Sequence, residues 1–309
     1  MTAFRPARVL VPLITPFDEN GRVDEAALER HANEVPANGA AGLVAVATTG
    51  EATALEEDER ARVIAICASV CAAREAVLIV GAGTYNTRET IARHVALGDV
   101  PGVDASLAVV PYYVRPSEAA IVAHFQTVAA SSPVPLVIYN IPYRTARGLG
   151  TSALLELAGT DNIVGVKQAV GGLYADTLQV LAGAPAGFSV LGGDDAFLLP
   201  LVLMGGAGAI AASANVATAQ YVAMVDHGLA GKVAEGRRLA QALLPLTLAL
   251  FAEPSPAILK AVLHAQGQIP TEHVRMPLSD ASGAARDRAL AALDAVAQLH
   301  TRAVASSST

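Results

Sequence analysis

The sequence carries little positive charge, which limits the partners that the protein can have. Its 309 residues include 21 Lys and Arg against 28 Asp and Glu, giving a formal net charge of −7, and the arginines are dispersed along the chain. Nucleic acids and anionic membrane surfaces attract proteins that gather basic residues on one face. We therefore expect no nucleic-acid partner and no membrane partner.

Cysteines and long apolar runs are also scarce. The two cysteines, Cys67 and Cys71, stand four residues apart, a spacing that places both on one face of a helix and favours buried thiols over a disulfide or a zinc site. The sequence lacks the run of about 18 apolar residues that a membrane-spanning helix needs, and its first residues lack the order of a signal peptide. These absences predict a soluble, cytoplasmic protein.

Lysine is rare, and one of the three lysines occupies an unusual place. Lys167 directly follows Ile-Val-Gly-Val, an apolar run typical of a strand that is buried on both faces of a parallel sheet. A buried amine must be paired or have a lowered pKa, and a neutral amine can condense with a ketone to form a Schiff base. The alternative is a structural lysine whose ammonium group reaches solvent at the end of the strand.

Short apolar runs alternate with helical patterns along the first 230 residues. This regular order indicates a parallel α/β sheet, and its length matches a (β/α)8 TIM barrel, with a doubly wound open sheet as the main rival. After residue 231 the pattern is purely helical, so we expect a barrel over residues 1–230 and a C-terminal helical appendage, packed on the barrel, over residues 231–309. The predicted strands are Val9–Thr15, Gly42–Ala47, Val77–Gly81, Ala105–Val110, Leu136–Tyr139, Ile163–Lys167, Phe188–Leu191 and Gly208–Ala211, and the appendage helices are Lys232–Leu250, Ser255–Ala265 and Gly283–His300.

Side chains that can take part in catalysis gather where the predicted strands end, which is where the active sites of such barrels lie. An amine can capture a ketone, phenols can move protons and a guanidinium can hold a carboxylate, so the set suits carbonyl chemistry. Taken singly, each segment also has a structural explanation as a turn, a packing residue or a helix cap. The residues are Thr48–Glu51, Tyr112, Tyr113, Tyr139, Asn140, Arg144, Lys167 and Gly192–Asp195.

Three other chemistries are disfavoured by order and spacing. Gly206, Gly208 and Ala211 approach a dinucleotide-binding fingerprint, but they precede a strand instead of following one. The seven histidines lie in helical or C-terminal segments without ligand spacing, which argues against a metal-dependent aldolase. The sequence also lacks the Gly-x-Ser-x-Gly elbow of a Ser-His-Asp hydrolase.

Several segments together resemble one enzyme family. They follow one another in the family's order from about Val9 to Leu278, and they resemble the dihydrodipicolinate synthase / N-acetylneuraminate lyase family of class I pyruvate-dependent aldolases. Within that family the synthase branch is the more similar one. The segments are Ala47–Glu51, Pro111–Pro116, Tyr139–Thr145, Gly165–Lys167, Gly192–Asp195, Ala214–Val216 and Glu253–Pro256.

The resemblance implies a lyase mechanism that begins with pyruvate. Lys167 would form an imine with pyruvate, whose methyl group then loses a proton to give an enamine. Tyr139 would be the proton shuttle nearest the imine, and Thr49 and the backbone at Ile210 would hold the pyruvate carboxylate, with Gly193 also in the substrate-binding set. No metal and no cofactor are expected, because the lysine itself supplies the electron sink.

The resemblance also implies a second substrate and an oligomer. Thr48 would link Tyr139 to Tyr113 in a hydroxyl relay, and Tyr113 would come from a neighbouring subunit, so we expect a homotetramer built as a dimer of dimers. Arg144 would bind the carboxylate of L-aspartate semialdehyde. The product would be 4-hydroxy-tetrahydrodipicolinate, an intermediate of lysine biosynthesis.

Departures from the family pattern leave alternatives for the second substrate. Gln168 stands where the synthase branch has Glu, and Val110 and Val170 make the pocket less polar. A less polar pocket suits another pyruvate-forming aldolase or a keto-acid dehydratase acting on a sugar-derived keto acid, and a non-catalytic keto-acid-binding barrel is a further alternative. Glu57 and Arg60 replace the histidines of the lysine feedback site of one subgroup, which predicts weak or absent inhibition by lysine.

Overall fold

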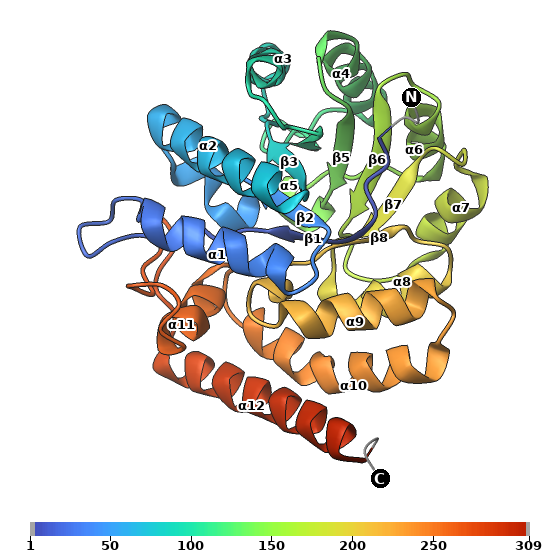
Figure 1. Ribbon diagram of the computed structural model, residues 1–309. Coiled ribbons are helices and arrows are strands. Elements are labelled where there is room, and N and C mark those ends of the chain that lie inside the picture. The colour runs from blue at the N-terminus through green and yellow to red at the C-terminus, as the bar shows by residue number, and fades with distance from the viewer. Residues whose placement is uncertain (1–3, 307–309) are drawn as a thin grey trace.

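Eight parallel strands close into a barrel in chain order in the computed structural model, which describes residues 4–306 and side chains up to residue 298 (Figure 1). The predicted (β/α)8 barrel is therefore confirmed. Each predicted strand is present, with ends that differ by a few residues. The strands are β1 (Arg8–Pro12), β2 (Gly42–Ala45), β3 (Val77–Gly81), β4 (Ala105–Val109), β5 (Leu136–Asn140), β6 (Ile163–Gln168), β7 (Ser189–Gly192) and β8 (Gly208–Ile210).

Helices surround the barrel (Figure 1), and some of them begin at a capping side chain. The carboxylate of Asp24 accepts a hydrogen bond from the N–H of Ala27 at the start of α1, and the hydroxyl of Ser117 accepts one from Ala120 at the start of α4. The helices are α1 (Glu25–Ala37), α2 (Glu57–Arg74), α3 (Thr87–Ala96), α4 (Glu118–Ser131), α5 (Pro142–Thr145), α6 (Thr151–Ala158), α7 (Ala175–Gly183), α8 (Leu198–Leu203), α9 (Thr218–Leu229), α10 (Val233–Leu250), α11 (Ala257–Ala265) and α12 (Gly283–Ser306).

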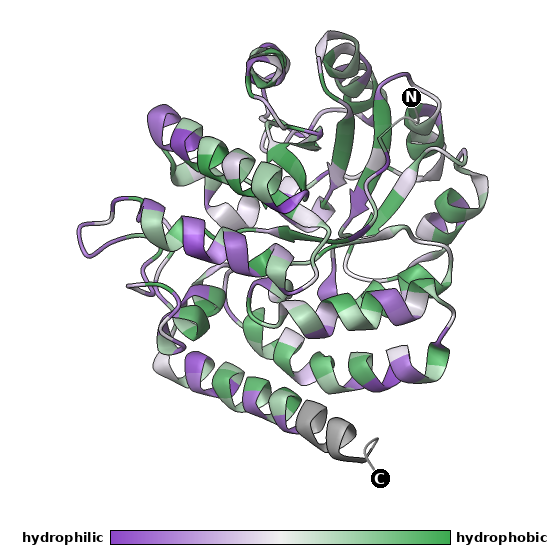
Figure 2. Cartoon of the chain, viewed as in Figure 1, coloured by the Kyte–Doolittle hydropathy of each residue, from purple (hydrophilic) through white to green (hydrophobic). Residues whose placement is uncertain are grey.

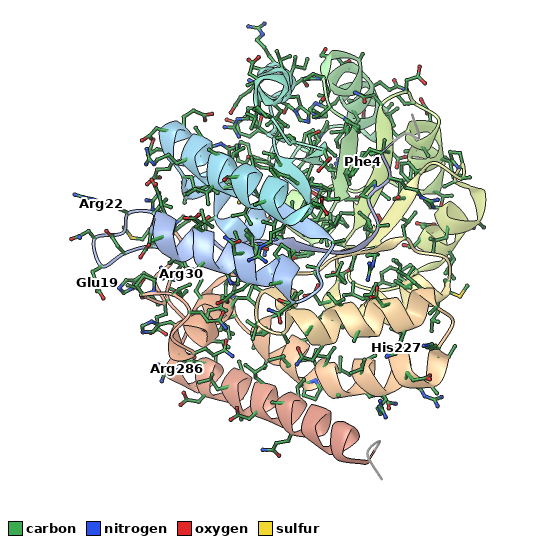
Figure 3. All side chains as sticks on the ribbon, in the orientation of Figure 1. Phe4, Glu19, Arg22, Arg30, His227 and Arg286 are labelled. Atoms are coloured by element: carbon green, nitrogen blue, oxygen red, sulfur yellow. The ribbon has the colours of Figure 1, made fainter. Side chains whose placement is uncertain are left out.

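The barrel interior is filled by apolar side chains from most of the strands. Because helices cover the outer face of the sheet, the strands are buried on both faces and carry almost continuous apolar sequence, as the green strands of Figure 2 show. Phe4 packs against this interior cluster from the segment before β1 (Figure 3). Its fully buried members include Leu10, Val44, Ile79, Val137, Leu191 and Ile210.

The C-terminal helices extend the core of the barrel. In Figure 1, α9, α10 and α12 lie as successive layers on one side of the barrel. Leu246 of α10, Ile258 of α11 and Val296 of α12 belong to the same buried cluster as Val9 and Val11 of β1. This shared cluster stabilises the helices on the barrel, and the boundary near residue 230 stays a prediction.

The fold bears on the cysteines and on the membrane-spanning helix that the sequence was expected to lack. Cys67 and Cys71 are free thiols buried in α2, and burial raises the pKa of Cys71 to about 12, so this thiol is unreactive at neutral pH. Within residues 4–306, no helix combines the length and apolar character needed to cross a membrane.

Candidate active site

The loops after the strands contain much of the strained backbone of the protein. Residues 4–306 include eight non-glycine residues with positive φ, and five of these follow β2, β4 or β5. Such conformations cost about 1–3 kcal/mol each and persist where the surrounding structure fixes them, often at functional sites. The five are Val46, Glu51, Tyr113, Arg115 and Ala146, with φ from 47° to 67°. This end of the barrel is therefore the candidate site.

Lys167 lies on β6 as a buried amine without a close counter-charge. Its side chain is almost fully enclosed, with 5% of the residue surface exposed. Burial lowers the pKa of Lys167 to about 8, an effect that the carboxylate of Asp195 opposes from a distance. Among the described residues, the lysine that forms an ion pair is Lys260, whereas Lys167 forms none. A lowered pKa leaves part of the Lys167 amine neutral at pH 7 and therefore nucleophilic.

Tyr139 is the aromatic neighbour of Lys167. The two residues are paired in the register of β5 and β6, and the Lys167 Nζ lies 4.3 Å from the centroid of the Tyr139 ring. Burial raises the pKa of Tyr139, although nearby Arg144 and a hydrogen bond with Thr48 both act to lower it. The phenol therefore stays protonated at neutral pH, beside the amine and in hydrogen-bond contact with a hydroxyl group. This geometry suits proton transfer at a group bound to Lys167.

Gly193 lets the chain pass directly beside the lysine side chain. A Cβ atom at this position would lie 2.9 Å from Cε of Lys167 and 2.9 Å from Cβ of Ala169. The N–H of Gly193 donates to the carbonyl oxygen of Gln168 at 2.9 Å, which holds this close approach in place. Any larger residue would displace the lysine side chain.

Two carboxylates, the half-buried Asp194 and the buried Asp195, follow Gly193 and act electrostatically on Lys167. Asp194 accepts a hydrogen bond from the N–H of Gly171 at 2.7 Å, and Asp195 accepts one from the N–H of Ser213 at 2.6 Å. Burial raises the pKa of both carboxyl groups, whereas these hydrogen bonds and the charge of Lys167 lower it. Both groups are held by backbone amides and do not reach the lysine itself.

The ends of the two strands that flank β1 position Thr48, Thr49 and Ile210. Thr48 and Thr49 form a short 3-10 turn after β2, in which Thr49 is buried and Thr48 is exposed to solvent. Ile210 ends β8 and is fully buried. Because β1 lies between β2 and β8 in the barrel, these residues lie on both sides of one strand at the same end. The turn is fixed by Thr15, whose hydroxyl donates to the carbonyl oxygen of Gly50 at 2.8 Å.

Arg144 lines a cavity of about 540 Å³ at this end of the barrel. Thr48 and Tyr139 contribute to the same wall, and so do Tyr85 and Tyr112, whose rings meet edge to face with centroids 5.5 Å apart. Lys167 is not part of the wall, since it is buried beside Tyr139. Tyr139 thus lines the cavity and also contacts Lys167.

Tyr113 does not join this cavity within one chain. It follows β4 with φ 67° and is 86% exposed. Within residues 4–306 of a single chain, no hydrogen bond connects Tyr113 to Thr48, so the relay inferred from the sequence is not formed inside one subunit. That a neighbouring subunit supplies Tyr113 to the site stays a prediction.

Several residues at this end of the barrel were not predicted from the sequence. Arg275 and Leu278, from the segment after α11, line the cavity, and Lys260 forms a buried ion pair at 2.8 Å with Glu51, a candidate residue whose partner was not predicted. One signal was available in the sequence: Lys260 is the only charged residue in the apolar run Ala257–Leu263, and a buried charge needs a partner. The identity of that partner, 209 positions away, was not readable.

Comparison with known proteins identifies the family. The model of the dihydrodipicolinate synthetase family matches residues 5–296. The chain belongs to the dihydrodipicolinate synthetase family. It is 39% identical to the 4-hydroxy-tetrahydrodipicolinate synthase of Neisseria meningitidis serogroup B over 290 residues, which cover 94% of this chain and 98% of that protein.

Solved structures of dihydrodipicolinate synthetase family members share this fold. The 4-hydroxy-tetrahydrodipicolinate synthase of Methylacidiphilum fumariolicum SolV superposes with a TM-score of 0.90 at 32% identity, covering 95% of this chain and 97% of that one. The chloride-inhibited dihydrodipicolinate synthase of Acinetobacter baumannii, solved in complex with pyruvate, superposes with a TM-score of 0.90 at 31% identity, covering 94% and 99%. The family resemblance read from the motifs is thus confirmed.

Proposed function

We propose that the protein is a 4-hydroxy-tetrahydrodipicolinate synthase, a lyase that condenses pyruvate with L-aspartate semialdehyde. The observation that carries this proposal is the buried, unpaired amine of Lys167 beside the phenol of Tyr139. Relatives that carry the same name across nearly the whole chain support the choice of substrates, and a similar enzyme was solved in complex with pyruvate.

The reaction begins with capture of pyruvate by Lys167. With a pKa of about 8, about 10% of this amine is neutral at pH 7, against less than about 0.1% for an ordinary lysine. The neutral Nζ forms a bond to the ketone carbon, and the carbonyl oxygen leaves as water to give an imine. Tyr139 delivers the proton that the departing oxygen needs and later receives a proton from the methyl group, which converts the imine into an enamine.

The remaining site residues hold and join the two substrates. In this proposal Thr49 and the backbone at Ile210 bind the pyruvate carboxylate, while Gly193 leaves room for the imine. The enamine carbon then forms a bond to the aldehyde carbon of the semialdehyde, whose carboxylate is bound by Arg144, while the aldehyde C=O π bond opens and its oxygen takes a proton from Tyr139 to become a hydroxyl. The amino group of the semialdehyde then attacks the imine carbon and closes the ring. The bond from that carbon to Nζ breaks as Nζ takes the proton that the amino group loses, which releases Lys167 as a free amine.

A homotetramer, built as a dimer of dimers, completes the proposal. Tyr113 and the adjacent Val114 are large and exposed, at 86% and 55%, and together they form a projecting apolar tip that a second copy of the chain can cover. In the assembled enzyme, Tyr113 of a neighbouring subunit extends the hydroxyl relay from Tyr139 and Thr48. The proposed location of this tetramer is the cytoplasm.

The proposal is tested by two assays on the full chain. Borohydride reduction in the presence of pyruvate is expected to add the mass of the reduced pyruvate adduct to the peptide that contains Lys167, and no adduct there contradicts the Schiff-base mechanism. Pyruvate-dependent consumption of L-aspartate semialdehyde is then expected. If a sugar-derived keto acid is turned over instead, the protein is another aldolase or a dehydratase, and trapping without any turnover indicates a keto-acid-binding barrel.

A further inference from the structure

The backbone that carries Arg144 is held firmly by buried groups. Arg144 belongs to α5, a single helical turn whose last residue, Thr145, is 1% exposed. The hydroxyl of Thr145 donates to the carbonyl oxygen of Ile141 at 3.0 Å. Asn140 precedes the turn and Leu149 follows it, and the side chain of Asn140 forms two hydrogen bonds of 3.1 Å with the backbone of Leu149. The position of the Arg144 backbone is therefore fixed, while its long side chain needs separate support.

The side chain of Arg144 is supported by the preceding residue. Among the described residues, no carboxylate forms an ion pair with Arg144. Its Nε donates a hydrogen bond to the phenol oxygen of Tyr143 at 3.1 Å, and its guanidinium carbon lies 5.2 Å from the centroid of the Tyr143 ring. A hydrogen bond and a cation–π contact therefore act on the same guanidinium group. Tyr143 itself is 65% exposed and does not line the cavity that Arg144 lines.

We propose that Tyr143 is a positioning residue for the second substrate: it holds Arg144 so that the Nη1 and Nη2 edge of the guanidinium meets the carboxylate of the acceptor aldehyde. This inference rests on the function proposed above and concerns a residue to which that function assigns no role. It makes Tyr143 act through Arg144, without direct contact with the reacting atoms.

The geometry restricts how a carboxylate can bind. A guanidinium offers five N–H donors on a planar fork, and a carboxylate can bind either the edge formed by Nε and one Nη or the edge formed by both Nη atoms. The Tyr143 oxygen occupies the Nε–H, so the first edge is lost and the second remains. The acceptor is then bound in one orientation, which fixes the distance between its aldehyde carbon and the enamine.

The charge of Arg144 also acts on the two groups that are proposed to carry out catalysis. Besides burial, it is one of the influences on the pKa of Tyr139 and on the pKa of Lys167, and it lowers both. A guanidinium that moved freely would change these effects as it moved. A fixed Arg144 thus keeps the environment of Lys167 constant while the acceptor enters.

The test compares two variants of Tyr143 with a matched control. Tyr143→Phe removes the hydroxyl and keeps the ring, whereas Tyr143→Ser removes both contacts. The control is Tyr174→Phe, which removes another exposed phenol, one that forms neither a hydrogen bond nor a ring contact with Arg144 in the described part of the chain. We expect Tyr143→Phe to raise the KM for L-aspartate semialdehyde about three- to tenfold, as loss of one ordinary, solvent-exposed hydrogen bond predicts, and Tyr143→Ser to raise it further. The KM for pyruvate and the yield of borohydride trapping are expected to change less than about twofold in all three.

A double-variant experiment separates positioning from a general structural role. A lysine at position 144 keeps the charge but lacks the Nε–H that Tyr143 accepts. In the Arg144→Lys background, Tyr143→Phe is therefore expected to have no further effect on the KM for the semialdehyde. An equal additional effect in that background, or equal increases in the KM values of both substrates, overturns the inference, and so does an unchanged KM in both Tyr143 variants.

The unchanged enzyme is assayed first, so that failure of the proposed function is recognised separately. If it traps pyruvate but consumes a different carboxylated acceptor, the KM of that acceptor replaces the KM of the semialdehyde and decides the inference in the same way. If it traps no pyruvate, the proposed function fails and the role of Tyr143 fails with it.

Discussion

Two buried lysines, Lys167 of β6 and Lys260 of α11, differ in whether the amine has a carboxylate partner. Burial lowers the pKa of both Lys167 and Lys260 to about 8, and both ammonium groups lie over an aromatic ring, at 4.3 Å from the Tyr139 centroid and 3.9 Å from the Phe17 centroid. Lys260 also forms an ion pair with Glu51 at 2.8 Å, whereas Lys167 has no carboxylate within that range among the described residues.

The surroundings of Lys260 explain why it is structural. Glu51 accepts from the Lys260 Nζ with one oxygen and from the backbone N–H of Arg275 with the other, and Arg275 in turn forms two hydrogen bonds with Glu59. This network joins the segment after α11 to the loop after β2, and it leaves the Lys260 amine enclosed and occupied. A buried lysine is thus available for chemistry only where the protein leaves it unpaired.

The largest expected effect is the loss of catalysis when Lys167 is replaced. Lys167→Met removes the amine that captures pyruvate and should reduce kcat/KM by at least about 10⁴-fold, as loss of a covalent nucleophile does. Lys260→Met should retain a pyruvate-trapping Lys167 wherever the variant is folded. Steady-state kinetics and trapping with pyruvate check both variants, and comparable activity in Lys167→Met would contradict the assignment.

The same two substitutions should change stability in opposite directions. Lys260→Met leaves the carboxylate of Glu51 buried and unpaired, which should lower the free energy of unfolding by about 3–5 kcal/mol. Folding lowers the pKa of Lys167 from 10.5 to about 8. Protonation therefore favours the unfolded state, and the resulting destabilisation is fully present below pH 8. Lys167→Met should therefore raise the free energy of unfolding at pH 7 by about 1–3 kcal/mol.

Denaturant unfolding curves measure this contrast and its pH dependence. The stabilisation by Lys167→Met should fade as the pH rises from 8 towards 10.5, since both states then carry a neutral amine. In the Glu51→Leu background, Lys260→Met should recover most of the stability lost in the single variant. A destabilised Lys167→Met at pH 7 would show that Lys167 is a packing residue.

A smaller effect is expected from crowding Lys167. The Cβ atom of Gly193→Ala would lie 2.9 Å from Cε of Lys167, so the amine must move by several tenths of an ångström. Displacement of a reacting group on the scale of an ångström can cost about 10²-fold, so we expect kcat/KM for pyruvate to fall about 10- to 100-fold. The matched control is Gly187→Ala, where no atom lies within 4 Å of the new Cβ and little change is expected.

The smallest effect should come from adding a charge beside the lysine. Gln168 accepts a hydrogen bond from Asn140 at 3.0 Å and donates one to Thr177 at 3.2 Å. Gln168→Glu can keep both contacts, with Thr177 now donating, and it adds a negative charge next to Lys167. The pKa of Lys167 should rise by less than about one unit, which moves the acidic limb of kcat/KM for pyruvate to higher pH. A shift to lower pH would contradict this electrostatic account.

The barrel was predictable because each strand is buried on both faces. The apolar runs near Val9, Leu136 and Ile163 each form a strand, and their alternation with helical patterns was sufficient to give the topology. Strand ends were less accurate: β1 begins at Arg8 and ends at Pro12, because beyond Leu13 the N–H of Ile14 bonds to the side chain of Asn215 at 3.3 Å instead of to a neighbouring strand. Local pattern determines which segments form strands, but pairing with neighbours determines where they stop.

Contacts across long sequence separations were not predictable. The position of Lys167 after an apolar run was enough to suggest a buried amine, but the absence of a partner depends on where every carboxylate lies in the fold. The Glu51–Lys260 pair and the wall formed by Arg275 both depend on a segment more than 200 residues from the loop after β2. The support of Arg144 by Tyr143 joins adjacent residues, and it was not predicted because it depends on how their side chains are oriented in one helical turn.

The most direct test of the account measures imine formation at each lysine as a function of pH. The protein is incubated with pyruvate and cyanoborohydride between pH 6 and 10, and the initial rate of adduct formation is read by peptide mass spectrometry at Lys167, Lys260 and Lys232. The account predicts an adduct at Lys167 alone, with a rate that rises with pH and reaches half its maximum near pH 8, where the amine becomes neutral. An adduct at Lys260, or a midpoint near the ordinary lysine value of 10.5, would contradict the claim that Lys167 is the lysine kept unpaired for pyruvate.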